Sequence, residues 1–93
     1  MRNILQKPLF KRNYKKLAPN QRPEVNAAIR AIVTDPEIGE GKKADLAGVS
    51  VYKFSVAGQQ YLLAYCQEEN GDIVLLPLGV HENFDRELKR NLR

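Results

Sequence analysis

The sequence predicts an α+β fold with an N-terminal strand and a two-helix hairpin, then an antiparallel three-stranded meander and a short C-terminal helix. One observation is that apolar residues recur with the helical period of about 3.6 residues in the first third of the chain. Another is that short runs of β-branched and aromatic residues begin at residue 49. Each expected element has one apolar side, which is buried when both helices pack on one face of the sheet.

The first strand and the two helices are expected in the N-terminal third. Residues 3–6 are apolar enough for a strand, and Pro8 stands where a helix begins. Residues 9–17 place their apolar side chains on one side of that helix, which Pro19 ends. The next helix is the clearest in the sequence, and Asp35-Pro36 ends it. Its apolar residues follow the i, i+3, i+4, i+7, i+8 pattern and are Val25, Ala28, Ile29, Ile32 and Val33.

A loop and the first strand of the meander are expected next. Residues 35–48 lack periodicity and contain a proline and three glycines, which predicts a loop. In the strand expected at residues 49–56, Lys53 and Ser55 share the face opposite the aromatic residues. Because the helices cover one face of the sheet, we expect the face with Lys53 and Ser55 to remain available.

Two further strands complete the expected meander. Residues 60–66 are apolar on both faces and are therefore expected at the centre of the sheet. Ala57-Gly58 is suited to a tight turn before this strand, and Asn70-Gly71 favours a two-residue hairpin connection after it. The third strand, 73–78, is then antiparallel to the second, and a polar helix over approximately residues 82–91 follows it.

Length and composition exclude several classes of protein. Ninety-three residues form a single domain, 1–93, because two halves would each be too small to bury a separate core. The longest apolar run is far shorter than the roughly 20 residues of a membrane span. A single cysteine, Cys66, excludes an intramolecular disulfide and a cysteine-based zinc site. The opening residues lack the apolar core of a signal peptide, so we expect a cytoplasmic protein.

The net charge of +4 is unevenly distributed along the chain. Residues 1–23 carry seven basic and no acidic residues, residues 24–80 carry four basic and eight acidic, and residues 81–93 carry four basic and three acidic. A basic segment of this kind is typical of a protein that binds a polyanion. A helix face that is simply exposed to solvent is an equally good interpretation. The candidates for binding a polyanion are Lys11, Arg12, Lys15 and Lys16.

Two residues are suited to catalysis. His81 is the only histidine and lies at the junction between the last strand and the final helix. Its imidazole titrates near neutral pH, so it is a candidate general acid or base, or else a helix cap or loop hydrogen-bond partner. No second histidine or cysteine pair accompanies it, so we do not expect a metal site. No cofactor is expected either. Lys53 interrupts an apolar strand, where its ammonium suits either phosphate binding or protection of a sheet edge.

The expected C-terminal helix adds two candidates. Arg86 shares a helix face with Lys89 and either extends a basic surface or pairs with Glu82. Phe84 either stacks on a nucleic-acid base or packs inward. No Walker loop, Rossmann fingerprint or nucleophile elbow is present, which excludes the enzyme classes that depend on them.

Several segments match a known family in their order and spacing. They are Asp45-Leu46-Ala47-Gly48, Val51-Tyr52-Lys53-Phe54, Gln60-Tyr61-Leu62-Leu63-Ala64-Tyr65, and Leu75 to Gly79 running into His81-Glu82-Asn83-Phe84. With the small size and the basic N-terminus, they make the whole chain resemble the RelE/ParE superfamily of bacterial type II toxins. The resemblance implies a RelE/ParE-like fold and a cognate antitoxin that wraps the toxin. RelE-like members cut messenger RNA in the ribosomal A site, whereas ParE-like members poison DNA gyrase.

The resemblance also assigns positions. Lys53 matches a strand lysine that ribonuclease members use, and His81 matches the place of a catalytic arginine or histidine after the last strand. Two positions depart from the RelE pattern. Leu62 stands in place of a phosphate-binding arginine, and Ser55 stands in place of a second lysine.

The resulting hypothesis is a ribosome-dependent mRNA endoribonuclease that inhibits translation. In it, His81 transfers protons, while Lys53 and Arg86 stabilise charge on the scissile phosphate. Phe84 positions a base, and the basic helix docks on ribosomal RNA. Two alternatives stay open: a ParE-like inhibitor of DNA gyrase, which needs no catalytic residues, and a non-toxic module that binds only the antitoxin. No membrane partner is expected.

Overall fold

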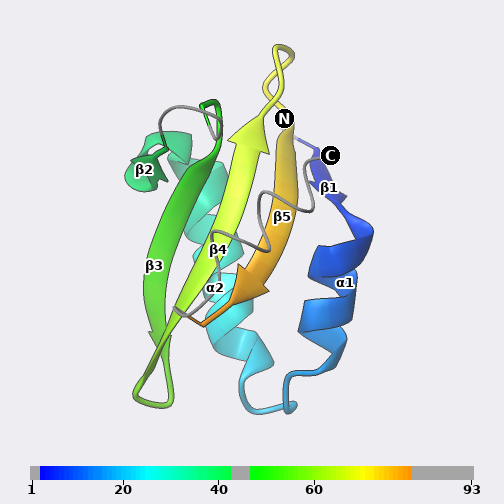
Figure 1. Cartoon of the computed structure of the whole chain (residues 1–93), viewed down its shortest axis with the longest axis vertical. Coiled ribbons are helices and arrows are strands. Elements are labelled where there is room, and N and C mark those ends of the chain that lie inside the picture. The colour runs from blue at the N-terminus through cyan, green and yellow to red at the C-terminus, as the bar shows by residue number, and fades with distance from the viewer. Residues whose placement is uncertain (1–2, 43–46, 81–93) are drawn as a thin grey trace.

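The computed structural model describes residues 3–42 and 47–80, and within them it has the expected α+β architecture (Figure 1). The helix expected over residues 82–91 lies outside the described residues. In chain order the elements are β1 (Ile4–Gln6), α1 (Pro8–Lys15), α2 (Arg22–Thr34), the 3-10 helix η1 (Pro36–Ile38), β2 (Glu40–Gly41), β3 (Ser50–Val56), β4 (Gln59–Gln67) and β5 (Ile73–Gly79).

The two predicted helices are confirmed, with ends that follow from proline chemistry. Pro8 opens α1, where the missing N–H of proline would have no helical partner anyway. The apolar stripe of α2 is buried at Val25, Ala28 and Ile32, as its spacing predicts. The helix stops before Pro36, because a proline restricts the residue before it to an extended conformation. No helix among the described residues is long and apolar enough to cross a membrane.

The sheet has more strands than the predicted meander. The antiparallel meander of β3, β4 and β5 is confirmed, and β4 lies at the centre of the order β1-β5-β4-β3-β2. The N-terminal strand β1 joins the sheet parallel to β5, so the described sheet is mixed and five-stranded. The prediction of a plain loop over residues 35–48 is wrong, because η1 and β2 lie there. A two-residue strand is too short to produce a periodic signal.

The two hairpin turns differ in length. Ala57 and Gly58 form the predicted tight turn with φ angles of 51° and 83°, the left-handed region that this two-residue hairpin needs. The second hairpin is longer than predicted, because the Glu68 N–H donates to the Asp72 carbonyl at 2.8 Å and leaves residues 69–71 between them. Gly71 in this loop has φ of 95°, as three-residue hairpins commonly require.

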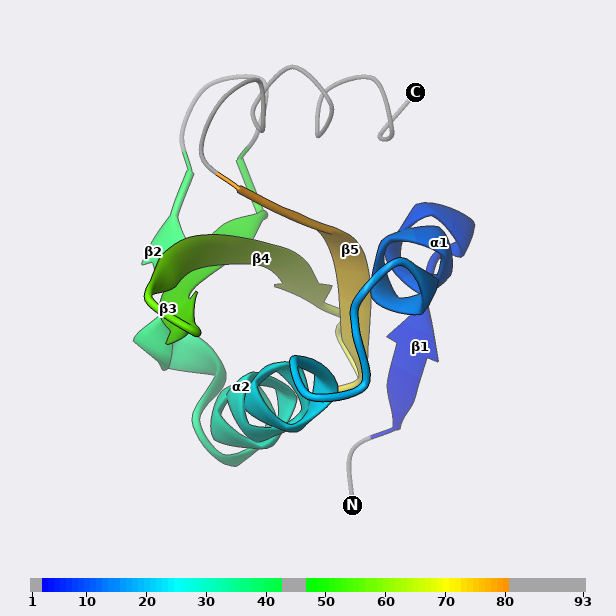
Figure 2. The same ribbon diagram turned by 90° about the horizontal axis from the view of Figure 1, so that it is seen from below.

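Both helices contribute to one core on the inner face of the sheet. Figure 2 shows α2 across this face and α1 alongside β5, at the end of the sheet that carries β1. The alternation of β3 is as predicted, because Tyr52 and Phe54 pack against this core. The core cluster consists of Phe10, Leu17, Val25, Ile32, Leu63, Tyr65, Ile73, Leu75 and Leu78.

The opposite face of the sheet differs from the expectation of an available surface. Lys53 and Ser55 are exposed, as expected. The same face also carries a second buried cluster, in which no member is more than 5% exposed: Val49, Val51, Leu62, Ala64, Val74 and Leu76. Alternation indicates the face to which a side chain points, but it does not indicate how much of that face is covered.

Tyr65 fastens the segment before β2 to the central strand. The residue is 1% exposed, and its hydroxyl donates to the Pro36 carbonyl and accepts from the Gly39 N–H at 3.0 Å. A Cβ on Gly39 would lie 2.5 Å from this hydroxyl oxygen, so the close approach requires glycine. Burial raises the pKa of Tyr65 from its ordinary value of 10.0.

Candidate functional site

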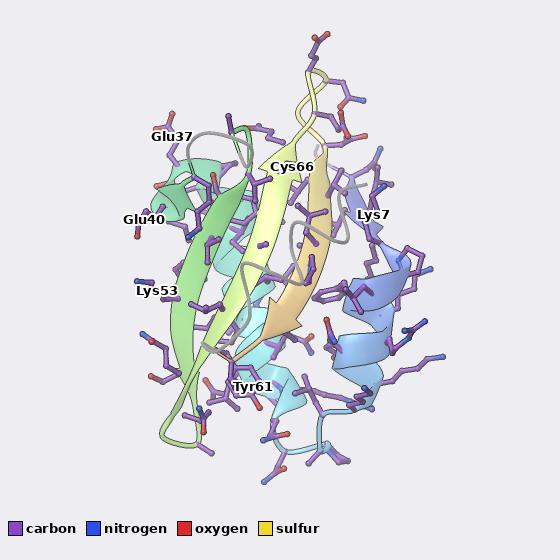
Figure 3. The ribbon with its side chains drawn as sticks, viewed as in Figure 1. Lys7, Glu37, Glu40, Lys53, Tyr61 and Cys66 are labelled. Carbon is purple, nitrogen blue, oxygen red and sulfur yellow. The ribbon has the colours of Figure 1, made fainter. Side chains whose placement is uncertain are left out.

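Lys53 is the only lysine or arginine in the three strands β3, β4 and β5. It lies on β3 beyond the reach of β2, which pairs only with Ser50 and Val51. Its side chain is exposed and projects outward from the sheet in Figure 3. A lysine at a sheet edge discourages pairing with another strand, and its ammonium also suits an anion such as phosphate.

The strand register places Lys53 level with the end of β5. Lys53 is paired with Leu62 on β4, and Leu62 is paired with Gly79 on β5. Directly paired residues point to the same face, so this cross-strand row lies on the face of Lys53. Two strand spacings separate Lys53 from Gly79, which corresponds to roughly 10 Å between their Cα atoms. Val80 then leads directly into His81.

A β-bulge in β5 produces this register. Leu63 pairs with Leu78 whereas Tyr65 pairs with Leu75, so two residues of β5, numbers 76 and 77, face one residue of β4. The extra residue reverses the alternation, which places Leu78 in the inner core and Gly79 on the face of Lys53. Residue 77 is a proline, which strands tolerate at such irregularities because it has no N–H to donate.

Asn13 holds the strand end beyond the bulge. Its side-chain oxygen accepts a hydrogen bond from the Leu78 N–H at 3.1 Å, across 65 residues of sequence. Just before α1, the Lys7 N–H donates to the Leu75 carbonyl at 3.1 Å. The contacts of β1 with the edge of β5 are thus continued by α1. Asn13 is not among the site residues predicted from the sequence. The one local indication of a role is that asparagine is unfavourable inside a helix.

The two departures from the RelE pattern have definite places. Leu62 lies directly opposite Lys53 and is 5% exposed within the second buried cluster. An apolar side chain therefore occupies the position beside Lys53. Ser55 follows on the same strand, is paired with Gln60, and is exposed. Neither position supplies a second cation next to Lys53.

Five exposed cations line α1 and its ends, and we call them the basic helix surface. No acidic residue occurs among residues 3–23, and Arg12 and Lys15 in the last turn also complement the helix dipole. Figure 3 places Lys7 near the opposite edge of the sheet from Lys53, so the fold separates these two predicted binding elements. The basic helix surface consists of Lys7, Lys11, Arg12, Lys15 and Lys16.

Arg22 is basic but joins the two helices. Its guanidinium lies 5.3 Å from the centre of the Tyr14 ring, and one of its terminal nitrogens donates to the Lys15 carbonyl at 3.5 Å. The Tyr14 hydroxyl in turn donates to the Asn26 side-chain oxygen at 2.9 Å. A cation held over an aromatic ring stabilises the packing of α1 on α2.

None of the described acidic residues lies in α1. Glu37 and Glu40 lie in η1 and β2, across the sheet from Lys7 in Figure 3. Glu68, Glu69 and Asp72 lie in or beside the turn between β4 and β5. Because α1 presents only positive charge, the field of the molecule favours its approach to a polyanion.

Three predicted site residues, His81, Phe84 and Arg86, lie outside the described residues. The described part of the chain brings Lys53 level with the strand end from which the segment containing them starts. The other predicted binding residues, Lys11, Arg12, Lys15 and Lys16, lie together on α1 and at its end.

Comparison with known families identifies the kind of protein. Residues 4–89 match the family model described as the ParE-like toxin of type II bacterial toxin-antitoxin systems. The chain belongs to this family. It is therefore a toxin of a type II system, within the RelE/ParE superfamily that the sequence resembles. A comparison of this ParE-like toxin with curated protein sequences gives no match.

Solved structures show that this ParE-like toxin has a RelE-like fold. A double arginine-to-alanine mutant of the Escherichia coli toxin RelE in the free state is similar at a TM-score of 0.76 and 14% identity, over 99% of this chain and 98% of that one. The intact E. coli RelBE toxin-antitoxin complex has a matching chain at a TM-score of 0.69 and 16% identity, covering 88% and 99%. The Mycobacterium tuberculosis RelBE2 toxin-antitoxin complex matches at 0.65 and 18%, covering 86% and 98%.

Proposed function

We propose that this toxin is a ribosome-dependent mRNA endoribonuclease that stops translation. The observation that carries the proposal is the cross-strand row from Lys53 through Leu62 to Gly79, two residues before His81. Lys53 lies in this row, and His81 follows two residues after its last member. A lysine and a histidine together supply the charge stabilisation and the proton transfer that phosphate chemistry needs. The RelE-like fold supports this class of activity.

The proposed reaction uses the nucleophile of the substrate. The 2′-hydroxyl attacks the adjacent phosphorus, the bond to the 5′-oxygen of the next nucleotide breaks, and a 2′,3′-cyclic phosphate forms. His81 either takes the proton from the 2′-hydroxyl or gives one to the leaving 5′-oxygen, and water exchanges the other proton. Lys53 and Arg86 stabilise the additional negative charge on the phosphoryl oxygens, and Phe84 stacks on a base. The reaction requires no metal, because the attacking oxygen already belongs to the RNA.

The basic helix surface is proposed to dock on ribosomal RNA. Its five cations are exposed, and no acidic residue among residues 3–23 opposes them. Such contacts neutralise phosphates and release counterions, so they give affinity without sequence preference. The distance of this surface from Lys53 suits a division of roles, in which α1 holds the ribosome and the sheet holds the messenger RNA.

A cognate antitoxin and a cytoplasmic location complete the proposal. Two of the similar structures are toxin-antitoxin complexes, which supports an antitoxin as the partner of this toxin as well. In the proposal, the antitoxin keeps the toxin inactive until it is released. The toxin acts in the cytoplasm, because its target is the translating ribosome.

One observation favours a second candidate, inhibition of DNA gyrase. Leu62 lies beside Lys53 at a position where a phosphate-binding arginine would assist cleavage. An inhibitor that acts by binding alone tolerates this apolar residue, because it has no transition state to stabilise.

Pulse labelling after induction of the toxin separates the two functions. The endoribonuclease predicts that protein synthesis stops first and that purified toxin cuts messenger RNA only in the presence of ribosomes. His81→Ala and Lys53→Ala should lose cleavage, whereas Arg30→Ala, which removes an exposed cation of α2, is the matched control and should retain it. A primary stop in DNA synthesis with intact messenger RNA would instead establish the gyrase inhibitor.

A further inference from the structure

The end of β5 depends on few partners for its position. On the side of β5 that is turned away from β4, the pairing with β1 reaches only as far as Leu75. Beyond that point the sheet order provides no further strand on this side among the described residues. Pro77 weakens the stretch, because it has no N–H for either neighbour. The last residues of β5 are therefore held by β4 on one side and by α1 on the other.

The bulge turns the Leu78 N–H away from β4, and Asn13 accepts the hydrogen bond that this N–H donates. In a regular strand, N–H groups alternate between the two neighbours, and the bulge reverses this alternation after residue 76. The Leu78 N–H is directed to α1, where the Asn13 side-chain oxygen accepts it at 3.1 Å. Asparagine has a low helix propensity, so its place within α1 is accounted for by this long-range contact.

The pairing register between β4 and β5 decides which residue of β5 lies in the row of Lys53. With the bulge, Gly79 is opposite Leu62, in the row of Lys53. Without it, continuation of the pairing between Tyr65 and Leu75 would place residue 78 opposite Leu62. Leu78 and Gly79 would then each be displaced by one residue, about 3.3 Å, and would exchange faces.

We infer that Asn13 is a positioning residue for the end of β5, from which the segment containing His81 continues in the sequence. Its side-chain oxygen holds the Leu78 N–H and thereby the bulged register, which places Gly79, two residues before His81 in the sequence, in the row of Lys53. The effect on cleavage rests on the proposed function, whereas the effect on the register does not. Asn13 also belongs to the helix of the basic helix surface, so one residue joins the proposed docking element to the strand end.

Three variants of the full-length toxin test this role. Asn13→Leu keeps the approximate shape of the side chain but removes the acceptor, and Asn13→Asp keeps an acceptor oxygen. Asn26→Leu is the matched control, because it removes the acceptor of the Tyr14 hydroxyl elsewhere on the helical hairpin. The measurements are hydrogen exchange of the Leu78 amide by NMR, thermal unfolding, and kcat and KM for messenger RNA cleavage on programmed ribosomes.

We expect Asn13→Leu to accelerate exchange of the Leu78 amide and to lower kcat by about 100-fold, as misplacement of a reacting group by ångströms does. KM should stay unchanged, because the basic helix surface is intact. Asn13→Asp should restore both the slow exchange and kcat. Asn26→Leu should leave both at the values of the unchanged toxin, even if it lowers the unfolding temperature.

Several results would overturn the inference. Unchanged exchange of the Leu78 amide in Asn13→Leu would show that Asn13 does not hold the strand end. An unchanged kcat, or equal losses in Asn13→Leu and Asn26→Leu, would reduce Asn13 to a general stabilising residue. If Asn13→Leu does not fold, Asn13→Gln takes its place, because it moves the same amide by one methylene. If the unchanged toxin cleaves nothing, the proposed function fails, and the amide exchange still decides whether Asn13 holds the register.

Discussion

Removal of the Tyr65 hydroxyl should destabilise the toxin, because this hydroxyl makes two hydrogen bonds in the folded state. Tyr65→Phe keeps the ring, which is buried in the inner core, and so should create no large cavity. It deletes one bond donated to the Pro36 carbonyl and one accepted from the Gly39 N–H. Each such bond contributes about 0.5–1.5 kcal/mol net, so the free energy of unfolding should fall by about 1–3 kcal/mol.

Chemical denaturation in urea measures this loss directly. For a chain of this size, each kcal/mol lowers the unfolding temperature by about 4–8 °C, so thermal unfolding provides an independent check. The dependence of the free energy on urea concentration should stay the same, because the amount of buried surface hardly changes. Hydrogen exchange should also quicken at the Gly39 amide, since its acceptor is gone.

Tyr61→Phe is the matched control for this experiment. Tyr61 is also a tyrosine of β4, it is partly buried against the same core, and its ring lies 6.2 Å from that of Phe54. The change should leave the free energy of unfolding within about 0.5 kcal/mol of the original. If Tyr65→Phe is equally neutral, the two hydrogen bonds do not hold the segment before β2.

Four further predictions concern packing, pH, thiol reactivity and charge. Gly39→Ala should lower the free energy of unfolding by about 1–3 kcal/mol in urea, because its Cβ would lie 2.5 Å from the Tyr65 hydroxyl oxygen; a neutral result would contradict the close approach. Burial raises the pKa of Tyr65 above 10.0, so the unfolded chain loses the hydroxyl proton at a lower pH than the folded toxin does. The free energy of unfolding should therefore fall as pH rises past 10.0, and Tyr65→Phe should reduce this fall. Burial also raises the pKa of Cys66 above 9.0, so its reaction with a thiol reagent near neutral pH should be slower in the folded toxin than in urea, and equal rates would argue against it. The double variant Lys11→Ala and Lys15→Ala should reduce the slope of log affinity for ribosomes against log salt by about 1.4–1.8, and an unaltered slope would exclude α1 from the contact.

The helices and the three long strands were predictable because their signals are local. The apolar spacing of α2 and the alternation around Lys53 each arise within one element, and the structure confirms both. The tight turn at Ala57-Gly58 was predictable for the same reason, since it depends on two adjacent residues. The family resemblance likewise rests on the order of such local segments and agrees with the match over residues 4–89.

The positions of β1 and β2 were not predictable from local patterns. The pairing of Ile4 with Ile73 joins residues that are far apart in the chain, and a parallel pair leaves no turn between its strands to reveal it. The two residues of β2 carry no periodicity, and their place follows from pairing with Val51 and from the anchoring of Gly39 by Tyr65.

By itself, the sequence determined that α1 and α2 are helices and that β1, β3, β4 and β5 are strands, together with the basic character of α1 and the face to which Lys53 points. Tertiary structure alone decided that Lys53, Leu62 and Gly79 form one row, because the bulge at Pro77 reverses an alternation that the local pattern continues. It also decided the role of Asn13, whose partner is distant in sequence. Side-chain periodicity is a property of neighbouring residues, whereas register and hydrogen-bond satisfaction depend on which segments meet after folding.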